Sequence, residues 1–484
     1  MDLVPLGIAG LDALLGGGLV AGTMALVEGA PGTGKTTLGL QFIHHGVVAR
    51  GESGLILTFE EVPQQLYRDA LNFGWDLRRL VQDGKLSVIF VTAEVLQRYL
   101  SDPEEMWQRL ARGAMPRRVL IDSVTHFQQL TADEVRLREI LNLFLSGMRR
   151  QGLTALLLKE MEQRNGGGIP FEEYAVDAVM RLTYVPEGEA GARQRYLEIL
   201  KTRGQEHVPG RHSFKFGPEG LRLFPHPRPR PIEPPRVERR AFLGIAGFDQ
   251  LLGAGVPAPT QVMLVGDTGV GKTLSSLLFT YEGLQCGDCC AFVGCDEVPA
   301  MTRRTLAHFG MPTAAHERLG RLRFVDAYAR EGTEEALAVS DPANLDEFLN
   351  VEDNVLAGLQ AQDGPGGCAA GWKRFCVDGI STIVATSTYQ QAIDFVAAHL
   401  HNLRARQVFS LDTYTSGALE PRLMANITQR YDLVIGLRFA EIHGVPIRLG
   451  AIEKYRFGKV AREEQIFSVD PRMGIVFHKA ALQG

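Results

Sequence analysis

Two glycine-rich segments of one pattern, G-x-x-x-x-G-K-[ST], occur in this chain of 484 residues, at Gly29–Thr36 and Gly266–Thr273. An apolar run precedes each segment, Met24–Val27 and Val262–Val265, and a stretch compatible with a helix follows it. Between a strand and a helix, this pattern forms a loop whose backbone N–H groups surround phosphate oxygens. We therefore expect two nucleotide-binding loops, each inside an α/β unit.

The two halves of the chain repeat each other beyond these loops. Gly7–Gly16, with the sequence Gly-Ile-Ala-Gly-Leu-Asp-Ala-Leu-Leu-Gly, recurs as Gly244–Gly253, with the sequence Gly-Ile-Ala-Gly-Phe-Asp-Gln-Leu-Leu-Gly. The number of residues from the start of the first copy to the start of the second is the same as for the two glycine-rich segments. A shared offset indicates that one whole domain has been duplicated.

A proline-rich segment, 224–235, separates the two copies. Proline at this density prevents a helix and favours extended backbone, so the segment is typical of a semi-rigid linker. We expect a first domain at 1–223, a linker at 224–240 and a second domain at 241–484.

Buried strands alternate with amphipathic segments in each half, which predicts an α/β fold with a mostly parallel twisted sheet covered by helices. A helix is expected at Thr131–Gln151, and Asp326–Gly371 is expected to be a partly helical insertion with a mobile end. The strands expected in the first half are Leu55–Phe59, Leu86–Phe90, Val119–Ile121 and Ala155–Leu158.

Composition limits the class of partner. Hydrophobic residues make up 45% of the chain, enough for a sizeable core in each half, and the net charge of −5 provides no general attraction to nucleic acid or anionic lipid. The N-terminus lacks the features of a signal peptide, and no apolar run approaches the length of a membrane span. We expect a soluble, cytoplasmic protein without a membrane partner.

All six cysteines lie in the second half. The cluster Cys286-Gly-Asp-Cys289-Cys290 resembles half of a zinc site, but no second Cys or His pair at metal spacing follows it. Cys290 and Cys295 fall in an apolar, strand-like run, where cysteine usually acts as a small buried hydrophobe. We expect neither a metal site nor disulfides.

The loops define the candidate nucleotide-binding residues. Lys35 and Lys272 can reach the β- and γ-phosphates of ATP, and the hydroxyls of Thr36 and Thr273 can hold Mg²⁺. The full sets are Gly29, Pro31, Gly32, Thr33, Gly34, Lys35, Thr36 and Thr37 in the first half, and Gly266, Thr268, Gly269, Val270, Gly271, Lys272, Thr273 and Leu274 in the second. An apolar strand that ends in an acid should supply a further Mg²⁺ group, which predicts Asp122 and Asp378.

A pair of acids follows the strand after each loop helix: Glu60 and Glu61 in the first half, Asp296 and Glu297 in the second. Acids at the carboxyl end of a parallel strand lie on the ligand side of the sheet. One of them could orient or deprotonate the water that attacks the γ-phosphate. Acids favoured only by the dipole of the following helix are an equal alternative.

A basic triplet stands near the end of each half and follows a strand-like run. Lys201 and Arg203 form the first triplet, and Lys454 and Arg456 form the second. A solvated strand end would explain such charges. Their repetition in both halves favours cationic groups that reach a phosphate.

These motifs together resemble the KaiC ATPases of the RecA-like superfamily, which carry two tandem P-loop NTPase domains stacked as a double ring. The resemblance spans nearly the whole chain. In the first half it rests on five segments: Gly29–Thr36, Thr58–Glu61, Phe73–Leu77, Ile121–Thr125 and Lys201–Gly204. It implies a homohexamer that binds ATP and Mg²⁺ between neighbouring subunits.

The resemblance also implies roles for individual residues. Glu60 and Glu61 become catalytic carboxylates, one of which activates water. Lys201 and Arg203, with His207, would act on the ATP of the adjacent subunit, so that hydrolysis depends on ring assembly.

The second half departs from the family pattern. Its first acid is Asp296, one methylene shorter than Glu, which could displace a general base by about an ångström. The two positions that are phosphoacceptors in clock-type members read Thr428 and Gln429, so only Thr428 carries a hydroxyl. We also expect the family's long C-terminal segment to be largely missing, because the sequence stops at Gly484. We therefore do not expect a two-site phosphorylation clock.

Four functions remain open. The leading one is a Mg²⁺-dependent ATPase, most active in the first half and coupled to ring conformation. A second is an autokinase in the second half that phosphorylates Thr428, and a third is a nucleotide-gated scaffold for a signalling partner with little turnover. The fourth, a recombinase or helicase, follows from the RecA-like core alone, and without a basic tail or zinc finger we do not expect a nucleic-acid partner.

Overall fold

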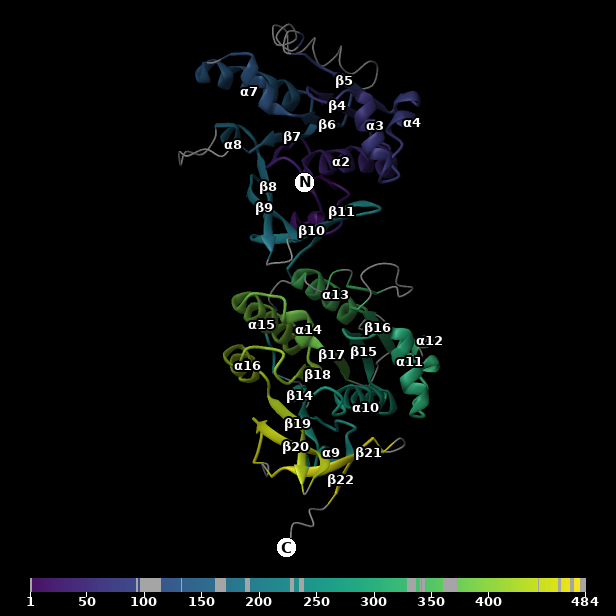
Figure 1. Ribbon diagram of the computed structural model, residues 1–484. Coiled ribbons are helices and arrows are strands. Elements are labelled where there is room, and N and C mark those ends of the chain that lie inside the picture. The colour runs from purple at the N-terminus through teal and green to yellow at the C-terminus, as the bar shows by residue number, and fades with distance from the viewer. Residues whose placement is uncertain are drawn as a thin grey trace. The chain divides into compact units, whose positions relative to one another are not determined.

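The computed structural model describes residues 2–92, 95, 115–131, 133–161, 171–187, 192–226, 230–234, 239–328, 337–339, 341, 344–359, 372–442, 444–459, 463–470 and 474–478. The chain divides into two units, Met1–Pro225 and His226–Gly484, which are called unit 1 and unit 2 below (Figure 1).

Unit 1 contains two short strands and a large sheet with its helices. Its elements are β1 (Leu3–Val4), α1 (Leu11–Leu14), β2 (Leu19–Val20), β3 (Met24–Gly29), α2 (Lys35–Arg50), β4 (Gly54–Thr58), α3 (Pro63–Leu71), α4 (Leu77–Gln82), β5 (Leu86–Phe90), β6 (Arg118–Asp122), the 3₁₀ helix η1 (Val124–Gln129), α7 (Glu134–Arg150), β7 (Thr154–Glu160), α8 (Phe171–Ala175), β8 (Ala178–Glu187), β9 (Ala192–Thr202), β10 (Arg211–Gly217) and β11 (Gly220–Phe224).

Unit 2 has the same series of strands, with α14 in the place of η1 and with α13 between β16 and β17. It contains β12 (Arg239–Ala241), α9 (Ala246–Leu252), β13 (Val256–Ala258), β14 (Gln261–Gly266), α10 (Lys272–Gln285), β15 (Cys289–Gly294), α11 (Pro299–His308), α12 (Ala314–Arg318), β16 (Leu322–Asp326), α13 (Leu345–Gly358), β17 (Lys373–Asp378), α14 (Ile380–Val384), α15 (Tyr389–Ala405), β18 (Val408–Thr415), α16 (Pro421–Thr428), β19 (Leu433–Ile442), β20 (Val445–Tyr455), β21 (Gln465–Asp470) and β22 (Gly474–His478).

Each unit has a nine-stranded sheet, and the two sheets have the same strand order. The order is β5-β4-β6-β7-β3-β8-β9-β10-β11 in unit 1 and β16-β15-β17-β18-β14-β19-β20-β21-β22 in unit 2. In both sheets the first six strands in this order are parallel and the last three pair antiparallel. The predicted α/β class is confirmed, as are the predicted strands, which lie within one or two residues of β4, β5, β6 and β7.

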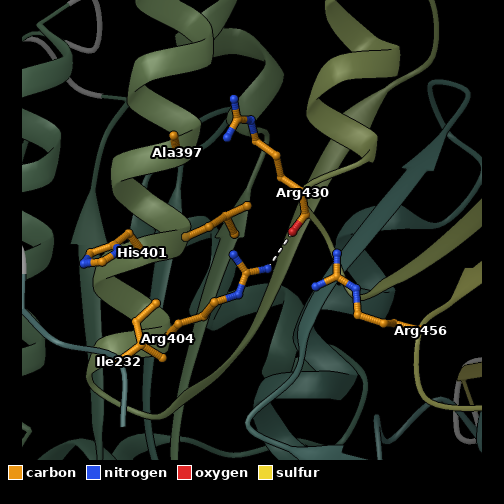
Figure 2. Close-up of a pocket in the computed structure, with 7 residues that line it drawn as sticks. Ile232, Ala397, His401, Arg404, Arg430 and Arg456 are labelled. Atoms are coloured by element: carbon orange, nitrogen blue, oxygen red, sulfur yellow. Dashed lines mark hydrogen bonds between the residues drawn. The ribbon is translucent and has the colours of Figure 1, made fainter. Parts of the chain in front are cut away.

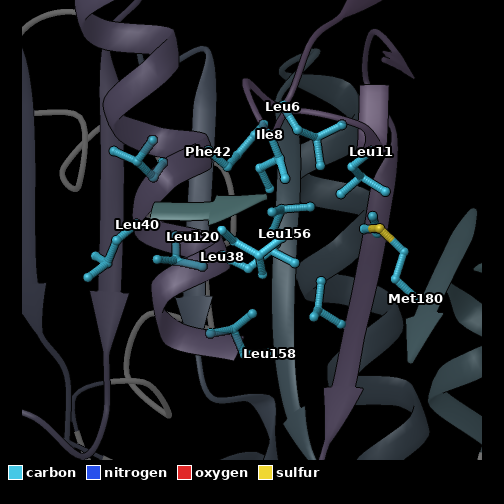
Figure 3. Packing of buried hydrophobic residues seen from close by; sticks show 14 of the residues in the cluster. Leu6, Ile8, Leu11, Leu38, Leu40, Phe42, Leu120, Leu156, Leu158 and Met180 are labelled. Atoms are coloured by element: carbon cyan, nitrogen blue, oxygen red, sulfur yellow. The ribbon is translucent and has the colours of Figure 1, made fainter. Parts of the chain in front are cut away.

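Helices cover both faces of the sheet in unit 1. On one face, α2 packs Leu38 and Phe42 against Leu120 of β6 and Leu156 of β7, all fully buried (Figure 3). On the other face, α7 contributes a second buried cluster that includes Phe144. Removing such a side chain from water stabilises the fold by about 1.5–3 kcal/mol. The loop between β3 and α2 is therefore attached at both ends to the core.

Helix α7 confirms the helix predicted at Thr131–Gln151. Its N-cap is Asp133, whose side chain accepts a hydrogen bond from the backbone N–H of Val135 at 2.9 Å. In unit 2, α13 lies inside the segment predicted as a partly helical insertion, which connects β16 to β17. Residues 360–371, the expected mobile end, lie outside the described residues.

The cysteine predictions are partly confirmed. Cys290, Cys295 and Cys376 are buried on the strands of unit 2 or directly after them, as expected of small hydrophobes. Burial raises the pKa of each thiol. The expectation that no disulfide forms is wrong for Cys289, which is disulfide-bonded. Cysteine spacing along the chain did not indicate this, because a disulfide depends on which distant segments the fold brings together.

Part of the proline-rich segment packs on unit 2. Nδ1 of His226 lies 3.3 Å from Oδ1 of Asp346 in α13, and His401 of α15 donates a hydrogen bond to the carbonyl of Arg230 at 2.9 Å.

None of the helices in the described part of the chain combines the length and the apolar character that crossing a membrane requires.

Candidate functional site

The first glycine-rich segment forms a loop between β3 and α2. The Lys35 ammonium donates hydrogen bonds to the carbonyls of Gly29 at 2.8 Å and Ala30 at 3.1 Å, so the charge lies over the loop where phosphates would bind. Burial lowers the pKa of Lys35, and the charges of Glu160, Asp122 and Glu60 oppose this shift. Gly34, directly before α2, has a φ of +102°, which glycine adopts without strain.

The hydroxyl of Thr36 donates a hydrogen bond to Asp122 at the end of β6, at 2.8 Å. Burial raises the pKa of Asp122, and the hydrogen bond from Thr36 opposes this. A hydroxyl and a carboxylate beside a phosphate loop are oxygen ligands of the kind that Mg²⁺ takes directly or through water. The two residues predicted from sequence as a Mg²⁺ pair are therefore in contact.

The second loop has the same geometry. Lys272 donates to the carbonyls of Gly266 and Asp267, both at 2.9 Å. Asp378 is buried, which raises its pKa, and hydrogen bonds from Thr273, Thr413 and Ser276 oppose the shift. The Thr413 and Ser276 bonds are 2.9 and 3.0 Å long.

Not every predicted loop residue points toward a ligand. Thr33 is buried and donates to the carbonyl of Ala30 at 2.8 Å, and Val270 and Leu274 are buried in the core of unit 2. These residues can offer a ligand only their backbone groups. The other predicted loop residues, Pro31, Gly32 and Thr37 in unit 1 and Thr268, Gly269 and Gly271 in unit 2, belong to the same two loops and helix starts.

The first acid pair lies beside the loop of unit 1. Glu60 Oε1 is 2.5 Å from Nε2 of His126, a residue of η1. Glu61 has a buried oxygen, Oε2, without a hydrogen-bond partner among the described residues. Burial raises the pKa of Glu61, and the charges of Asp122, Asp69 and Glu60 raise it further.

The second acid pair is held differently. Asp296 Oδ1 accepts a hydrogen bond from the hydroxyl of Thr382 at 2.8 Å, and Glu297 Oε1 accepts one from Thr302 at 3.1 Å. Both acids of unit 2 are therefore bound to threonine hydroxyls of their own unit. In unit 1, Leu66 occupies the position that corresponds to Thr302, five residues after the second acid, and it is buried.

The basic triplet of unit 1 is bound to its own unit. Lys201 Nζ donates to the carbonyls of Glu173 and Val176 at 2.7 and 2.8 Å, and burial lowers its pKa. Arg203 donates to the carbonyl of Tyr174 at 3.1 Å. His207 Nδ1 lies 2.8 Å from the hydroxyl of Thr202. Lys201, Arg203 and His207 thus lie at or just after the end of β9.

The triplet of unit 2 borders a basic pocket of about 400 Å³. Lys454 Nζ donates to three carbonyls around the end of α16, and Arg456 pairs with Asp432 at 2.8 Å. Figure 2 shows Arg404, Arg430 and Arg456 around this pocket, with Arg404 donating to the carbonyl of Arg430. Asp432 is the one carboxylate that pairs with Arg404 and Arg456 among the described residues, so the pocket has an excess of positive charge.

Thr428, the predicted phosphoacceptor, ends α16. Its hydroxyl donates to the carbonyl of Met424 at 2.7 Å. Thr428 also lines a cavity of about 430 Å³ to which Asp267 of the second loop contributes.

Sequence reasoning missed the partners of the acids. His126, Thr382, Thr302, Thr413 and Ser276 were not predicted, although each touches a predicted residue. Two of them did carry a signal: His126 and Thr382 each stand four residues after the Asp that ends the neighbouring strand.

The repeated sheet and its two loops define a P-loop NTPase built from two tandem RecA-like α/β domains. The family model for the KaiC ATPases matches residues 4–228 and 242–481, and the chain belongs to the KaiC family. It is 30% identical over 465 residues to the circadian clock oscillator protein KaiC of Thermostichus vulcanus, and the aligned residues make up 94% of this chain and 85% of that protein. It is 29% identical over 479 residues to the protein of the same name from Synechococcus elongatus, covering 96% and 87%.

Proposed function

We propose that this protein is a Mg²⁺-dependent ATPase that hydrolyses ATP mainly in unit 1. One observation carries the proposal: the acids differ between two otherwise equivalent sites. The first acid is bound in both units, Glu60 to His126 and Asp296 to Thr382. The second acid differs: Glu61 has an oxygen without a partner among the described residues, whereas Glu297 accepts a hydrogen bond from Thr302.

The arrangement suits attack of water on the γ-phosphate. The bond from water oxygen to phosphorus forms as the bond from phosphorus to the β–γ bridging oxygen breaks, and ADP leaves. We assign the water proton to Glu60, because its carboxylate is exposed and its charge reaches Lys35. Mg²⁺ held near Thr36 and Asp122 would neutralise negative charge on the phosphate oxygens.

The family supports a homohexameric double ring with ATP between subunits. In such a ring, Lys201 and Arg203 would exchange their present carbonyl partners for the phosphates of the neighbour's ATP. Hydrolysis would then depend on ring conformation, through which a signalling partner could read the nucleotide state.

Loop substitutions in the full chain test the proposal by steady-state phosphate release. We expect Lys35→Ala and Glu60→Gln each to reduce turnover at least about a hundredfold, since they remove phosphate binding and the proton acceptor. Lys272→Ala should leave most of the turnover. Full turnover in Lys35→Ala, with loss in Lys272→Ala, would assign hydrolysis to unit 2 instead.

A second candidate function is autophosphorylation of Thr428. The cavity shared by Thr428 and Asp267 favours it, because the hydroxyl and the second phosphate loop border one space. Transfer would form a bond from Thr428 Oγ to the γ-phosphorus and release ADP, with the hydroxyl proton going to a carboxylate. We expect mass spectrometry after incubation with ATP and Mg²⁺ to find a phosphate on Thr428 that is absent in Lys272→Ala. An unmodified peptide in the wild type removes this function.

A further inference from the structure

The first acid of each unit has a hydrogen-bond donor at the same place in the fold. In unit 1 the donor is His126, four residues after Asp122, and in unit 2 it is Thr382, four residues after Asp378. The two donor side chains differ in kind, and so do the two acids that they bind. Glu60 meets an imidazole and the shorter Asp296 meets a hydroxyl.

The register of the sheet produces this contact in both units. Thr58 pairs with Asp122 on the neighbouring strand, and Gly294 pairs with Asp378. The next residue then donates its backbone N–H to the carbonyl of that Asp, at 2.9 Å in unit 1 and 3.0 Å in unit 2. The acid that follows must therefore lie over the first turn after the neighbouring strand.

The position of the His126 ring is fixed from two sides. The ring stacks on Phe59, with centroids 6.1 Å apart and an angle of 10° between the planes. The amide nitrogen of Gln129 lies 3.0 Å from Nδ1. Because an amide nitrogen only donates, Nδ1 accepts, and in the neutral ring the proton is on Nε2, which faces Glu60.

We propose that His126 is a positioning residue that orients Glu60 for hydrolysis in unit 1, and that Thr382 is its counterpart for Asp296. The proposal rests on the ATPase function proposed above. A hydrogen bond from Nε2 of His126 to Oε1 fixes the carboxylate of Glu60. It leaves Oε2 of Glu60 to receive the proton of the attacking water. In this role His126 acts through Glu60 and not directly on water or phosphate.

Two substitutions of His126 separate its stacking on Phe59 from its role as a hydrogen-bond donor. His126→Phe keeps an aromatic ring beside Phe59 and removes the donor, whereas His126→Gln keeps an N–H donor at similar reach and removes the ring. Both variants are made in the full chain with Lys272→Ala, so that turnover reports on unit 1. The readouts are kcat, KM for ATP and the melting temperature.

We expect His126→Phe to lower kcat roughly tenfold or more with KM unchanged, since a general base displaced by about an ångström loses much of its effect. His126→Gln should retain most of the kcat. Wild-type kcat in His126→Phe overturns the proposal. Equal losses in both variants, together with a lower melting temperature, also overturn it, because they assign His126 a structural role alone.

Lys35→Ala in the same background keeps this test distinct from that of the ATPase function. If Lys35→Ala leaves turnover intact, hydrolysis does not occur in unit 1 and the proposed function fails. If Lys35→Ala abolishes turnover while His126→Phe changes neither kcat nor KM, the ATPase function stands and only the positioning role fails.

Discussion

Glu60 and Asp296 occupy one position in two copies of the same fold, and they differ by a single methylene. The shorter acid lies close to the backbone of the neighbouring strand: a Cβ at Gly379 would be 2.5 Å from Asp296 Oδ2. Any side chain at this position would displace the carboxylate. Glycine at 379 and aspartate at 296 therefore depend on each other, whereas unit 1 has Ser123 and Glu60 at the same two places.

The glycines directly before the loop helices offer a matched pair of substitutions. Gly34 and Gly271 both have positive φ, +102° and +123°, so alanine brings about 1–2 kcal/mol of backbone strain at either site. Only at Gly34 would the new Cβ clash, 2.2 Å from Phe216. We expect Gly34→Ala to destabilise unit 1 by about 1–3 kcal/mol more than Gly271→Ala destabilises unit 2.

Chemical denaturation with hydrogen exchange on peptides of each unit measures this difference. Equal losses of protection in the two variants would contradict the clash and leave only the shared strain.

The loops and strand-end acids could be predicted because their geometry is local. Lys35 and Thr36 are set by the turn that their own neighbours form, and Asp122 ends an apolar strand. His126 and Thr302 could not be assigned in this way. Their contacts depend on which strands pair and in which register, and the local motifs around these residues do not specify that pairing.

At the scale of elements, one core position holds an apolar side chain in unit 1 and a carboxylate in unit 2. Leu157 of β7 pairs with Leu26, and Asp412 of β18 pairs with Met263, the equivalent residue of unit 2. Asp412 is buried against His399 of α15, which also contacts Glu352 of α13. Charged side chains thus join α15 to α13 and β18, whereas the equivalent strand position of unit 1 holds the buried, apolar Leu157.

This buried network makes the stability of unit 2 depend on pH. Burial lowers the pKa of His399, but the charges of Glu352 and Asp412 outweigh it and raise the pKa to about 10. A histidine with a raised pKa in the folded state contributes its full stability below its ordinary pKa of 6.5. This contribution is lost as the pH rises toward about 10.

We expect His399→Phe to destabilise unit 2 by about 3–5 kcal/mol near pH 7, since two buried carboxylates lose their cation. The wild-type loss of stability between pH 7 and pH 10 should be weaker in the variant. Urea unfolding at several pH values, followed by hydrogen exchange in α15 and β18, measures both effects. Parallel pH curves for the two proteins would refute the assignment.

At the scale of the whole molecule, the same strand order appears twice with different side chains at the nucleotide sites. The shared sheet follows from the repeat, which the sequence shows directly. The division of labour that we propose rests on a few polar residues, such as Thr302 and Thr382, whose partners lie on other elements. Duplication therefore preserved the scaffold while the acids acquired different neighbours.

Mixing two inactive variants tests whether sites are shared between subunits. Lys35→Ala removes the phosphate contact in a chain's own loop, and Arg203→Ala removes the group proposed to act on the neighbour's ATP. We expect each variant alone to lose most turnover. Random mixing should restore about a quarter of the sites, those that join an intact Lys35 to an intact Arg203.

The control measures the size of the mixed particles with and without ATP and Mg²⁺. It shows whether rings form, and mixed sites arise only if these rings exchange subunits. Mixed rings that form but recover no phosphate release would show that Arg203 acts within its own chain.

The proline-rich segment has a practical consequence for dividing the protein. Because His226 and Arg230 contact α13 and α15, and Ile232 lines the basic pocket, these three residues belong physically to the second half. A fragment that starts at residue 241, where the repeat resumes, would expose the surfaces that these residues cover. Expression of the second half alone should therefore begin at His226, and the first half should end at Pro225.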